Sequence, residues 1–458
     1  MKKTLIHTSP KEALLIAALI VATMGVTIIS FEWVPHLAII LVLCGLMMFG
    51  FARRVCFKAM QKQMAEGVMS GIGAIYLFFF IGLLVSALMM SGAIPTLMYY
   101  GFGLISADYF YLSAFLLTAV TGVAIGSSLT TCATIGVAFI GMTEAFHANP
   151  AITAGAIVSG AFFGDKMSPL SDTTGIAASI VGIDLFEHIR NMMYTTVPAF
   201  ILTAVLFILF ADPSAANLDS IAAMKTQLLS SGLVHGYTLI PFAVLVILAL
   251  RKINAIYTII ATVATALVIT YIHSSPSISD IGGWFFAGYK PAADLGQTGS
   301  LLSRGGIQSM FFTQTIVILA LSLGGLLHAL GILPALLEGI RHLLTTTGRA
   351  TLSVAATALG VNVLIGEQYL SLMLAGETFK PVYDKLQLHP RNLSRTLEDA
   401  GTVINPLVPW SVCGVFISHA LGVPVIDYLP YAFFCYLCLL LTLLFGFSGL
   451  TISKKEEA

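Results

Sequence analysis

Charged residues are scarce along the whole chain. Only 10% of the 458 residues are Asp, Glu, Lys or Arg, while 57% are hydrophobic; an ordinary soluble domain carries roughly 25% charged residues. So few charges cannot cover the surface of a water-soluble protein of this length. The formal net charge is zero and no Lys- or Arg-rich tail is present, so the chain lacks the cationic surface that a nucleic acid needs. We therefore expect a membrane protein without a nucleic-acid partner.

A disulfide framework and common hydrolase motifs are also missing. The six cysteines lie mostly in apolar stretches, and even the Cys435-x-x-Cys438 pair falls inside an apolar span, which predicts free thiols that pack in the protein. Neither G-x-S-x-G nor H-E-x-x-H occurs. An intramembrane hydrolase that activates water with paired aspartates is therefore only a remote alternative. We predict a protein that is not an enzyme and that needs no cofactor.

Long apolar runs, by contrast, recur throughout the chain, and about 20 such residues cross a bilayer as a helix. They predict an all-α polytopic membrane protein, a single embedded domain over residues 1–458 with about ten full spans. The predicted spans are residues 13–31, 37–52, 68–90, 151–182, 194–211, 236–250, 254–272, 310–330, 400–420 and 427–447. The apolar segments 110–143 and 350–379 are interrupted by Gly and polar residues, which predicts re-entrant hairpins.

The basic residues orient these spans. Lys225, Lys290 and Arg304 fall in outer loops and Lys166 falls within the membrane, whereas every other Lys and Arg falls on the cytoplasmic side. This asymmetry follows the positive-inside rule. It predicts a multi-pass protein of the bacterial cytoplasmic (inner) membrane with both termini in the cytoplasm.

Two pairs of segments suggest an internal repeat. Residues 92–97 (GAIPTL) resemble residues 331–336 (GILPAL), and residues 164–174 (GDKMSPLSDTT) align with residues 401–411 (GTVINPLVPWS). In the predicted topology, span 68–90 runs outward and its counterpart 310–330 runs inward. We therefore predict two inverted repeats, residues 68–211 and 310–447, which is an architecture typical of secondary transporters.

Inverted repeats place a binding site near the membrane midplane, where broken helices leave carbonyl and N–H groups free to bind an ion. Four segments contain such helix-breaking residues: 126–131, 168–174, 366–369 and 405–411. A hard cation such as Na⁺ takes several oxygen ligands. The predicted ligands are Asp165, Ser168, Asp172, Thr173, Thr174, Ser127, Ser128 and Thr130.

The intramembrane carboxylates are the candidates for coupling, because charge inside a bilayer is costly. Asp172 is predicted to bind the cation and to take a proton when the cation leaves, whereas Asp165 is predicted to be held by Lys166. An ion pair between Lys166 and either aspartate that only fixes the helix break is the structural alternative. Glu367 is predicted to handle an ion or a proton.

The second repeat supplies fewer candidates. Gln368, Asn405 and Ser411 are predicted to form its site together with Glu367. Glu398 and Asp399 lie close to Arg391 and Arg395 in the sequence, and we predict an interfacial salt-bridge network for them rather than a ligand role.

The segment 164–174 resembles the signature of the NhaC-type Na⁺/H⁺ antiporter family. Residues 367–370 (EQYL), 389–402 (HPRNLSRTLEDAGT) and 406–410 (PLVPW) extend the resemblance over most of the chain. It implies the inverted repeats and re-entrant hairpins of the ion transporter superfamily. Trp410 is followed by Ser-Val-Cys where the family pattern has Asn-Thr-Cys, and this departure removes a carboxamide and a hydroxyl from the second-repeat site.

These observations predict a secondary active transporter that exchanges Na⁺ for H⁺ by alternating access, with both ions competing for intramembrane carboxylates. A Na⁺- or H⁺-coupled exchanger of a small carboxylate, such as malate or lactate, is the alternative that the resemblance leaves open. The expected partners are Na⁺, H⁺ and the lipid bilayer. The sequence leaves open the oligomeric state, including a homodimer, and the coupling stoichiometry.

Overall fold

The fold is all-helical apart from one isolated antiparallel bridge between Leu388 and Lys454. We describe it from a computed structural model, in which residues 4–105, 107–210, 218–291, 299, 302–340 and 346–455 are described. Among these residues, six helices are long and apolar enough to cross a membrane, and three bent helix pairs raise the number to nine. The chain is thus a multi-pass membrane protein, as predicted, with broken helices.

The helices of the first half begin with two long apolar ones and include those of segment 110–143. They are α1 (Pro10–Gly25), α2 (Pro35–Ala52), α3 (Phe57–Ser70), α4 (Ile72–Met90), α5 (Ala93–Leu104), α6 (Phe110–Ile125), α7 (Ser128–Thr131), α8 (Val137–Met142), α9 (Pro150–Met167), α10 (Asp172–Val181), α11 (Leu185–Leu209) and α12 (Leu218–Ser230). π-Helical turns Val26–Ser30 and Cys132–Gly136 and the 3₁₀ turn Ala107–Tyr109 join some of them.

The second half of the chain is also built from a succession of long and short helices. Its helices are α13 (Ile240–Leu250), α14 (Ala255–His273), α15 (Ile278–Ala287), α17 (Ile307–Ala329), α18 (Ile332–Ile340), α19 (Thr347–Ile365), α20 (Gln368–Lys385), α21 (Pro390–Leu397), α22 (Val412–Leu421), α23 (Val425–Tyr428) and α24 (Phe433–Ser448). A π-helical turn, Glu398–Thr402, continues α21, and 3₁₀ turns occupy Gly236–Leu239, Asn405–Leu407 and Leu429–Tyr431.

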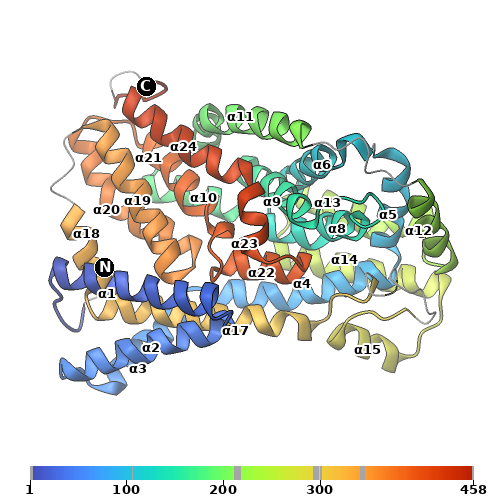
Figure 1. The fold of residues 1–458 in the computed structure, drawn as a ribbon, viewed down its shortest axis with the longest axis horizontal. Coiled ribbons are helices and arrows are strands. Elements are labelled where there is room, and N and C mark those ends of the chain that lie inside the picture. Colours follow the sequence, from blue (N-terminus) through green and yellow to red (C-terminus); the bar gives the residue numbers. More distant parts are fainter. Residues whose placement is uncertain are drawn as a thin grey trace.

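The arrangement groups these helices around the broken ones. The long helix α17 packs against α2, α3 and α4 along one edge, and α19, α20, α21 and α24 pack together at one end (Figure 1). Helices α6, α9 and α13 lie towards the other end, and the short helices α10, α22 and α23 lie in the middle (Figure 1). The helix breaks are therefore surrounded by other helices, which is where irregular backbone is tolerated in a membrane protein.

Several predicted spans differ from the observed helices in their bounds, continuity or length. Residues 151–182 form two helices, α9 and α10, separated at residues 168–171. The helical segment Gly236–Leu250 is short, because 15 residues reach only about 22 Å at 1.5 Å per residue. The predicted span 400–420 begins earlier, at Pro390. Polar residues in its first turns form hydrogen bonds with α11 and with the C-terminal segment, so their presence does not mark a loop.

Helix boundaries recur 240 positions apart in the two halves. The matching features are Gly126 and Gly366 (φ 73° and 80°), the N-cap serines Ser171 and Ser411, the N-caps Asn149 and His389, and Gly182 and Gly422. The sequence comparison aligned Pro169 with Pro406, whereas these caps align it with Pro409. In this register Asp165 corresponds to Asn405.

Helices α6 and α9 cross in close backbone contact. The Cα atoms of Gly122 and Gly164 face each other, and a Cβ on Gly164 would overlap the backbone of Gly122 and Val123. Only glycine allows this approach, a pattern common where membrane helices pack. The crossing holds α6 against the broken helix that carries Asp165.

The close crossing predicts a large effect of one methyl group. Gly164→Ala should force α6 and α9 apart and destabilise the protein by about 1–3 kcal/mol, the usual cost of overpacking. Thermal unfolding in detergent would measure this loss. Gly45→Ala is the matched control, because nothing lies within 4 Å of a Cβ built there. Equal melting temperatures for the two variants would show that the crossing can relax.

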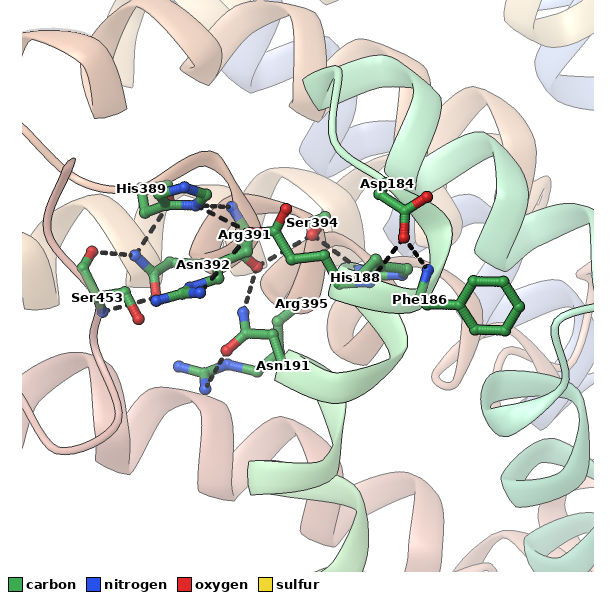
Figure 2. Close-up of polar contacts among 11 residues, drawn as sticks. Asp184, Phe186, His188, Asn191, His389, Arg391, Asn392, Ser394, Arg395 and Ser453 are labelled. Atoms are coloured by element: carbon green, nitrogen blue, oxygen red, sulfur yellow. Dashed lines mark hydrogen bonds and ion pairs between the residues drawn. The ribbon is translucent and has the colours of Figure 1, made fainter. Parts of the chain in front are cut away.

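The segment after α24 is hydrogen-bonded to the start of α21. The side chain of Asn392 donates to the carbonyl of Ser453 (2.7 Å) and accepts from the N–H of Ser453 (3.1 Å), as Figure 2 shows. The Nδ1 atom of His389 caps α21 by accepting the N–H of Arg391 (3.4 Å), and it also lies 3.5 Å from a carboxylate oxygen of Glu187 on α11. This contact set, the tail clamp, joins α11, α21 and the C-terminal segment.

The tail clamp should weaken in acid. Burial holds the pKa of His389 below its usual 6.5, Arg391 and Lys455 lower it further, and Glu187 opposes them. Because this pKa falls on folding, the stabilisation is complete above pH 6.5 and is lost as the pH drops through the lowered pKa. Protonated Nδ1 also cannot accept the Arg391 N–H, and a positive charge at a helix N-terminus is unfavourable. The amide hydrogen exchange rates of residues 449–455, corrected for the intrinsic pH dependence of exchange, should therefore increase below pH 6.5.

A cap that does not titrate provides the control for this pH effect. His389→Asn keeps a good N-cap, since Asn149 caps α9 in the same way. The exchange rates of this variant, corrected for intrinsic chemistry, should depend little on pH. An acid-dependent increase of the same size in both proteins would assign the effect to groups other than His389.

Candidate functional site

The first helix break separates α6 from α7. Gly126 ends α6 with φ 73°, and a Cβ there would lie 2.6 Å from Cβ of Leu170. Ser127 then caps α7, because its hydroxyl accepts the N–H of Thr130 at 3.3 Å. Position 126 requires a positive φ and leaves no room for a side chain, and only glycine meets both conditions easily. The chain therefore turns at this position, and α7 begins after the turn.

The second break separates α9 from α10 and lies against the first. The hydroxyl of Ser168 donates to the carbonyl of Val123 on α6 at 2.8 Å, and Ser171 caps α10 by accepting the N–H of Thr174 at 3.4 Å. The structure therefore brings together the two broken segments that the sequence analysis predicted to share one site.

Asp165 sits on α9 behind these breaks and is only 3% exposed. Its Oδ2 atom accepts the hydroxyl of Ser128 at 2.6 Å and the backbone N–H of Ser128 at 3.3 Å. Its Oδ1 atom is buried and has no hydrogen-bond partner among the described residues. A buried acceptor left without a partner costs free energy, so the charged form of Asp165 is costly in this position.

Asp172 occupies a different environment at the start of α10. It is exposed, and it lines a cavity of about 410 Å³ together with Ser127 and Thr130. Its Oδ2 atom accepts the hydroxyl of Tyr369 on α20 at 2.5 Å. Water therefore reaches Asp172 through this cavity, while Ser128 and Asp165 lie just behind its wall.

Lys166 does not pair with either aspartate of its own repeat. Its ammonium group forms an ion pair with Asp399, and both side chains are fully buried. It also donates to Thr195 on α11 at 3.3 Å. The prediction that Lys166 holds Asp165 was therefore wrong, because the ammonium points to the other half of the chain rather than to its neighbour in the sequence.

Glu398 and Asp399 are not interfacial, contrary to the sequence analysis. Both are 0% exposed, because α21 begins at Pro390 and the two carboxylates lie about two turns inside it. Asp399 also accepts the hydroxyl of Thr442 at 2.8 Å, and Glu398 accepts that of Thr173 at 3.2 Å. The sequence carries a signal for this start, since Pro390 after a capping residue is typical of the first helical position.

The residues predicted for the second repeat form a structural network. Glu367 caps α20 by accepting the N–H of Leu370 at 2.7 Å, and Asn405 donates to Asn362 at 2.9 Å and accepts the N–H of Cys413 at 3.1 Å. Ser411 donates to the carbonyl of Asn405 at 2.6 Å. Gln368 contacts the thiol of Cys413 at 3.7 Å. These hydrogen bonds hold the second hairpin against the second broken helix.

The predicted ligands thus separate into two groups. Ser127, Thr130 and Asp172 face the cavity, and Ser128 binds Asp165. Ser168 and Thr173 use their hydroxyls elsewhere, and Thr174 contacts the carbonyls of Asp165 and Lys166 at 3.5 and 3.4 Å. Within the described ranges, no three His, Cys, Asp or Glu side chains converge as in a metal-cofactor site. A cation bound here would need mixed carboxylate, hydroxyl and carbonyl ligands.

Comparison with known proteins assigns the family. The model of the Na⁺/H⁺ antiporter family matches residues 160–450, which include the break between α9 and α10 and the one before α22. The Na⁺/H⁺ antiporter NhaC of Alkalihalophilus pseudofirmus is 40% identical over 428 residues, which are 92% of each chain. The chain belongs to the NhaC-type Na⁺/H⁺ antiporter family. This confirms the resemblance seen in the sequence, and the chain is a secondary transporter rather than an enzyme.

Two further relatives extend the comparison. The NhaC antiporter of Bacillus subtilis is 38% identical over 423 residues, covering 90% of this chain and 92% of the relative. The malate-2H⁺/Na⁺-lactate antiporter of the same organism is 31% identical over 406 residues, covering 88% and 87%. Membership alone therefore leaves the transported substrate to be argued from the site.

Proposed function

We propose that this NhaC-type protein exchanges Na⁺ for protons at Asp165 and Asp172 across the bacterial cytoplasmic membrane. The observation that carries the proposal is the unpartnered Oδ1 atom of buried Asp165, immediately behind a water-accessible cavity that contains Asp172. The similarity to NhaC antiporters supports the choice of ions.

The environment of Asp165 favours competition between the two ions. A buried carboxylate without a cationic partner is costly in its charged form, so it is neutralised by a proton or by a bound cation. Na⁺ arriving through the cavity can use Oδ1 of Asp165, the carboxylate of Asp172 and nearby hydroxyl and carbonyl oxygens. Either ion removes the uncompensated charge, and an empty charged site is disfavoured.

The recurrence of caps and breaks at 240 positions supports two inverted repeats, residues 68–211 and 310–447, and exchange by alternating access. The cavity reaches Lys252 and Asn254, in the loop between α13 and α14. Because the distribution of basic residues assigns this loop to the cytoplasm, the conformation described here opens inward. Both termini would then also be cytoplasmic.

Ion flux in reconstituted vesicles tests the proposed exchange. A Na⁺ gradient should drive proton movement in the opposite direction, and the half-saturating Na⁺ concentration should rise as the pH falls, because protons occupy the same carboxylates. Proton movement that does not respond to Na⁺ would refute the proposal.

A small-carboxylate exchanger remains a second candidate, because the cavity contains a cationic group. Lys252 lines it, and about 410 Å³ falls within the usual range for small-molecule sites. The relative that is a malate-2H⁺/Na⁺-lactate antiporter gives this candidate further support. Accelerated flux upon adding malate or lactate to the same vesicles, lost in Lys252→Gln, would favour this function over simple Na⁺/H⁺ exchange.

A further inference from the structure

The π-helical turn Glu398–Thr402 presents two buried carboxylates with opposite surroundings. Asp399 is satisfied, since Lys166 pairs with one oxygen and the Thr442 hydroxyl donates to the other at 2.8 Å. Glu398 accepts the hydroxyl of Thr173 on Oε1, at 3.2 Å, and the hydroxyl of Thr402 also stabilises its carboxylate, but its Oε2 atom is buried without a hydrogen bond in the described part of the chain. π-Helical turns often occur at functional positions, and this one places an unsatisfied carboxylate in the protein interior.

Glu398 also lacks a cation of its own. The ammonium of Lys166 is engaged by Asp399, Thr195 and the thiol of Cys438. A fully buried carboxylate whose donors are neutral hydroxyl groups is far more stable when protonated than when charged. Glu398 is therefore equipped to hold a proton rather than to form a permanent ion pair.

Contacts connect Glu398 to the proposed exchange site. Its hydroxyl donor, Thr173, is adjacent to Asp172 in α10, and Asp165 acts on it electrostatically. Asp165 and Glu398 thus each present one unpartnered oxygen in the same buried region, one from each half of the chain. The titratable groups on the surrounding elements include Lys166 on α9, Asp172 on α10, Arg395 and Asp399 beside Glu398, Glu367 and Tyr369 at the start of α20, and Cys438 on α24.

We propose that Glu398 is a second proton-binding carboxylate of the exchange site, so that Na⁺ binding displaces two protons rather than one. This inference rests on the proposed Na⁺/H⁺ exchange. When Na⁺ binds, one proton leaves the Asp165–Asp172 pair and one leaves Glu398, both to the water on the side from which Na⁺ entered. When Na⁺ leaves on the other side, both groups take protons from the water there. The protein returns to its starting protonation state in every cycle, and one net positive charge crosses the membrane in the direction of the protons.

The pH dependence of Na⁺ affinity counts the displaced protons. At pH values where the carboxylates are protonated, Na⁺ must displace their protons to bind. By mass action, the half-saturating Na⁺ concentration then rises about a hundredfold for each unit by which the pH falls if two protons are displaced, and about tenfold if one is displaced. The wild type should approach the hundredfold slope in vesicle flux assays. Glu398→Gln, which keeps the size and the hydrogen-bonding capacity, should reduce the slope to about tenfold. Glu377→Gln on α20, an exposed site, should leave it unchanged.

Measurements on the wild type alone also decide the inference if Glu398→Gln fails to fold. A tenfold slope in the wild type overturns the two-proton site, and so does an unchanged slope in a folded Glu398→Gln variant. If that variant folds but does not transport, the Na⁺-dependent rise in melting temperature reports binding at each pH. Absence of Na⁺-driven proton flux in the wild type would instead refute the proposed function itself, so the two failures are distinguishable.

Discussion

Asp165→Asn is expected to abolish Na⁺-driven proton flux to the level of empty vesicles. The substitution preserves the size of the side chain and an oxygen for the Ser128 hydroxyl, which donates at 2.6 Å. It removes the charge that a cation must neutralise and the group that a proton must titrate. Flux in reconstituted vesicles, at several Na⁺ concentrations and pH values, measures the effect.

The exposed aspartate Asp427 on α23 provides the matched control, since Asp427→Asn removes the same charge outside the proposed site and should transport normally. Asp172→Asn is expected to abolish exchange as well, because Asp172 is the carboxylate in contact with the cavity. If Asp165→Asn transports like the wild type and Asp172→Asn is inactive, the exchange site is Asp172 alone and Asp165 is structural.

Lys166→Met is expected to cost about 3–5 kcal/mol of stability, because it leaves Asp399 buried without its cation. Both partners are fully buried, so water cannot replace the lost interaction. Thermal unfolding in detergent should show a marked loss, and yield from membranes should fall with it.

The double variant Lys166→Met/Asp399→Leu tests whether the loss comes from the orphaned charge. Removing both partners should recover much of the stability, since apolar replacements of buried ion pairs are often tolerated. Lys62→Met removes a lysine whose side chain is 74% exposed and should change stability by less than about 1 kcal/mol. A single Lys166→Met variant as stable as the wild type would show that Asp399 is readily neutralised by a proton.

Much of the helical framework could be predicted from the sequence, because its determinants are local. The apolar runs set the helices, and Gly126 and Gly366 mark where two of them must turn with positive φ. The family resemblance also followed from a local segment, 164–174, and the comparisons confirm it. Amphipathic helices such as α3 and α12 were not predicted, because a search for continuous apolar runs does not detect them.

The partners of the buried charges could not be predicted. Lys166 is adjacent to Asp165 in the sequence, yet it pairs with Asp399, 233 positions away. Glu398 looked like an interfacial residue because Arg391 and Arg395 precede it, but an earlier helix start carries it into the interior. Tyr369 was noted only as part of a break, whereas its hydroxyl contacts Asp172 from the other half of the chain.

The sequence by itself determined that this protein is a broken-helix membrane transporter of the NhaC family and that carboxylates lie within its membrane segments. Hydropathy, helix-breaking residues and motifs act over short stretches of chain, so they can be seen without a structure. Only the tertiary structure decided which carboxylates are neutralised by a cation and which are left unsatisfied. A buried charge is stabilised by whatever lies within a few ångströms in space, and Lys166, Asp399 and Glu398 each have such a neighbour in the other half of the chain.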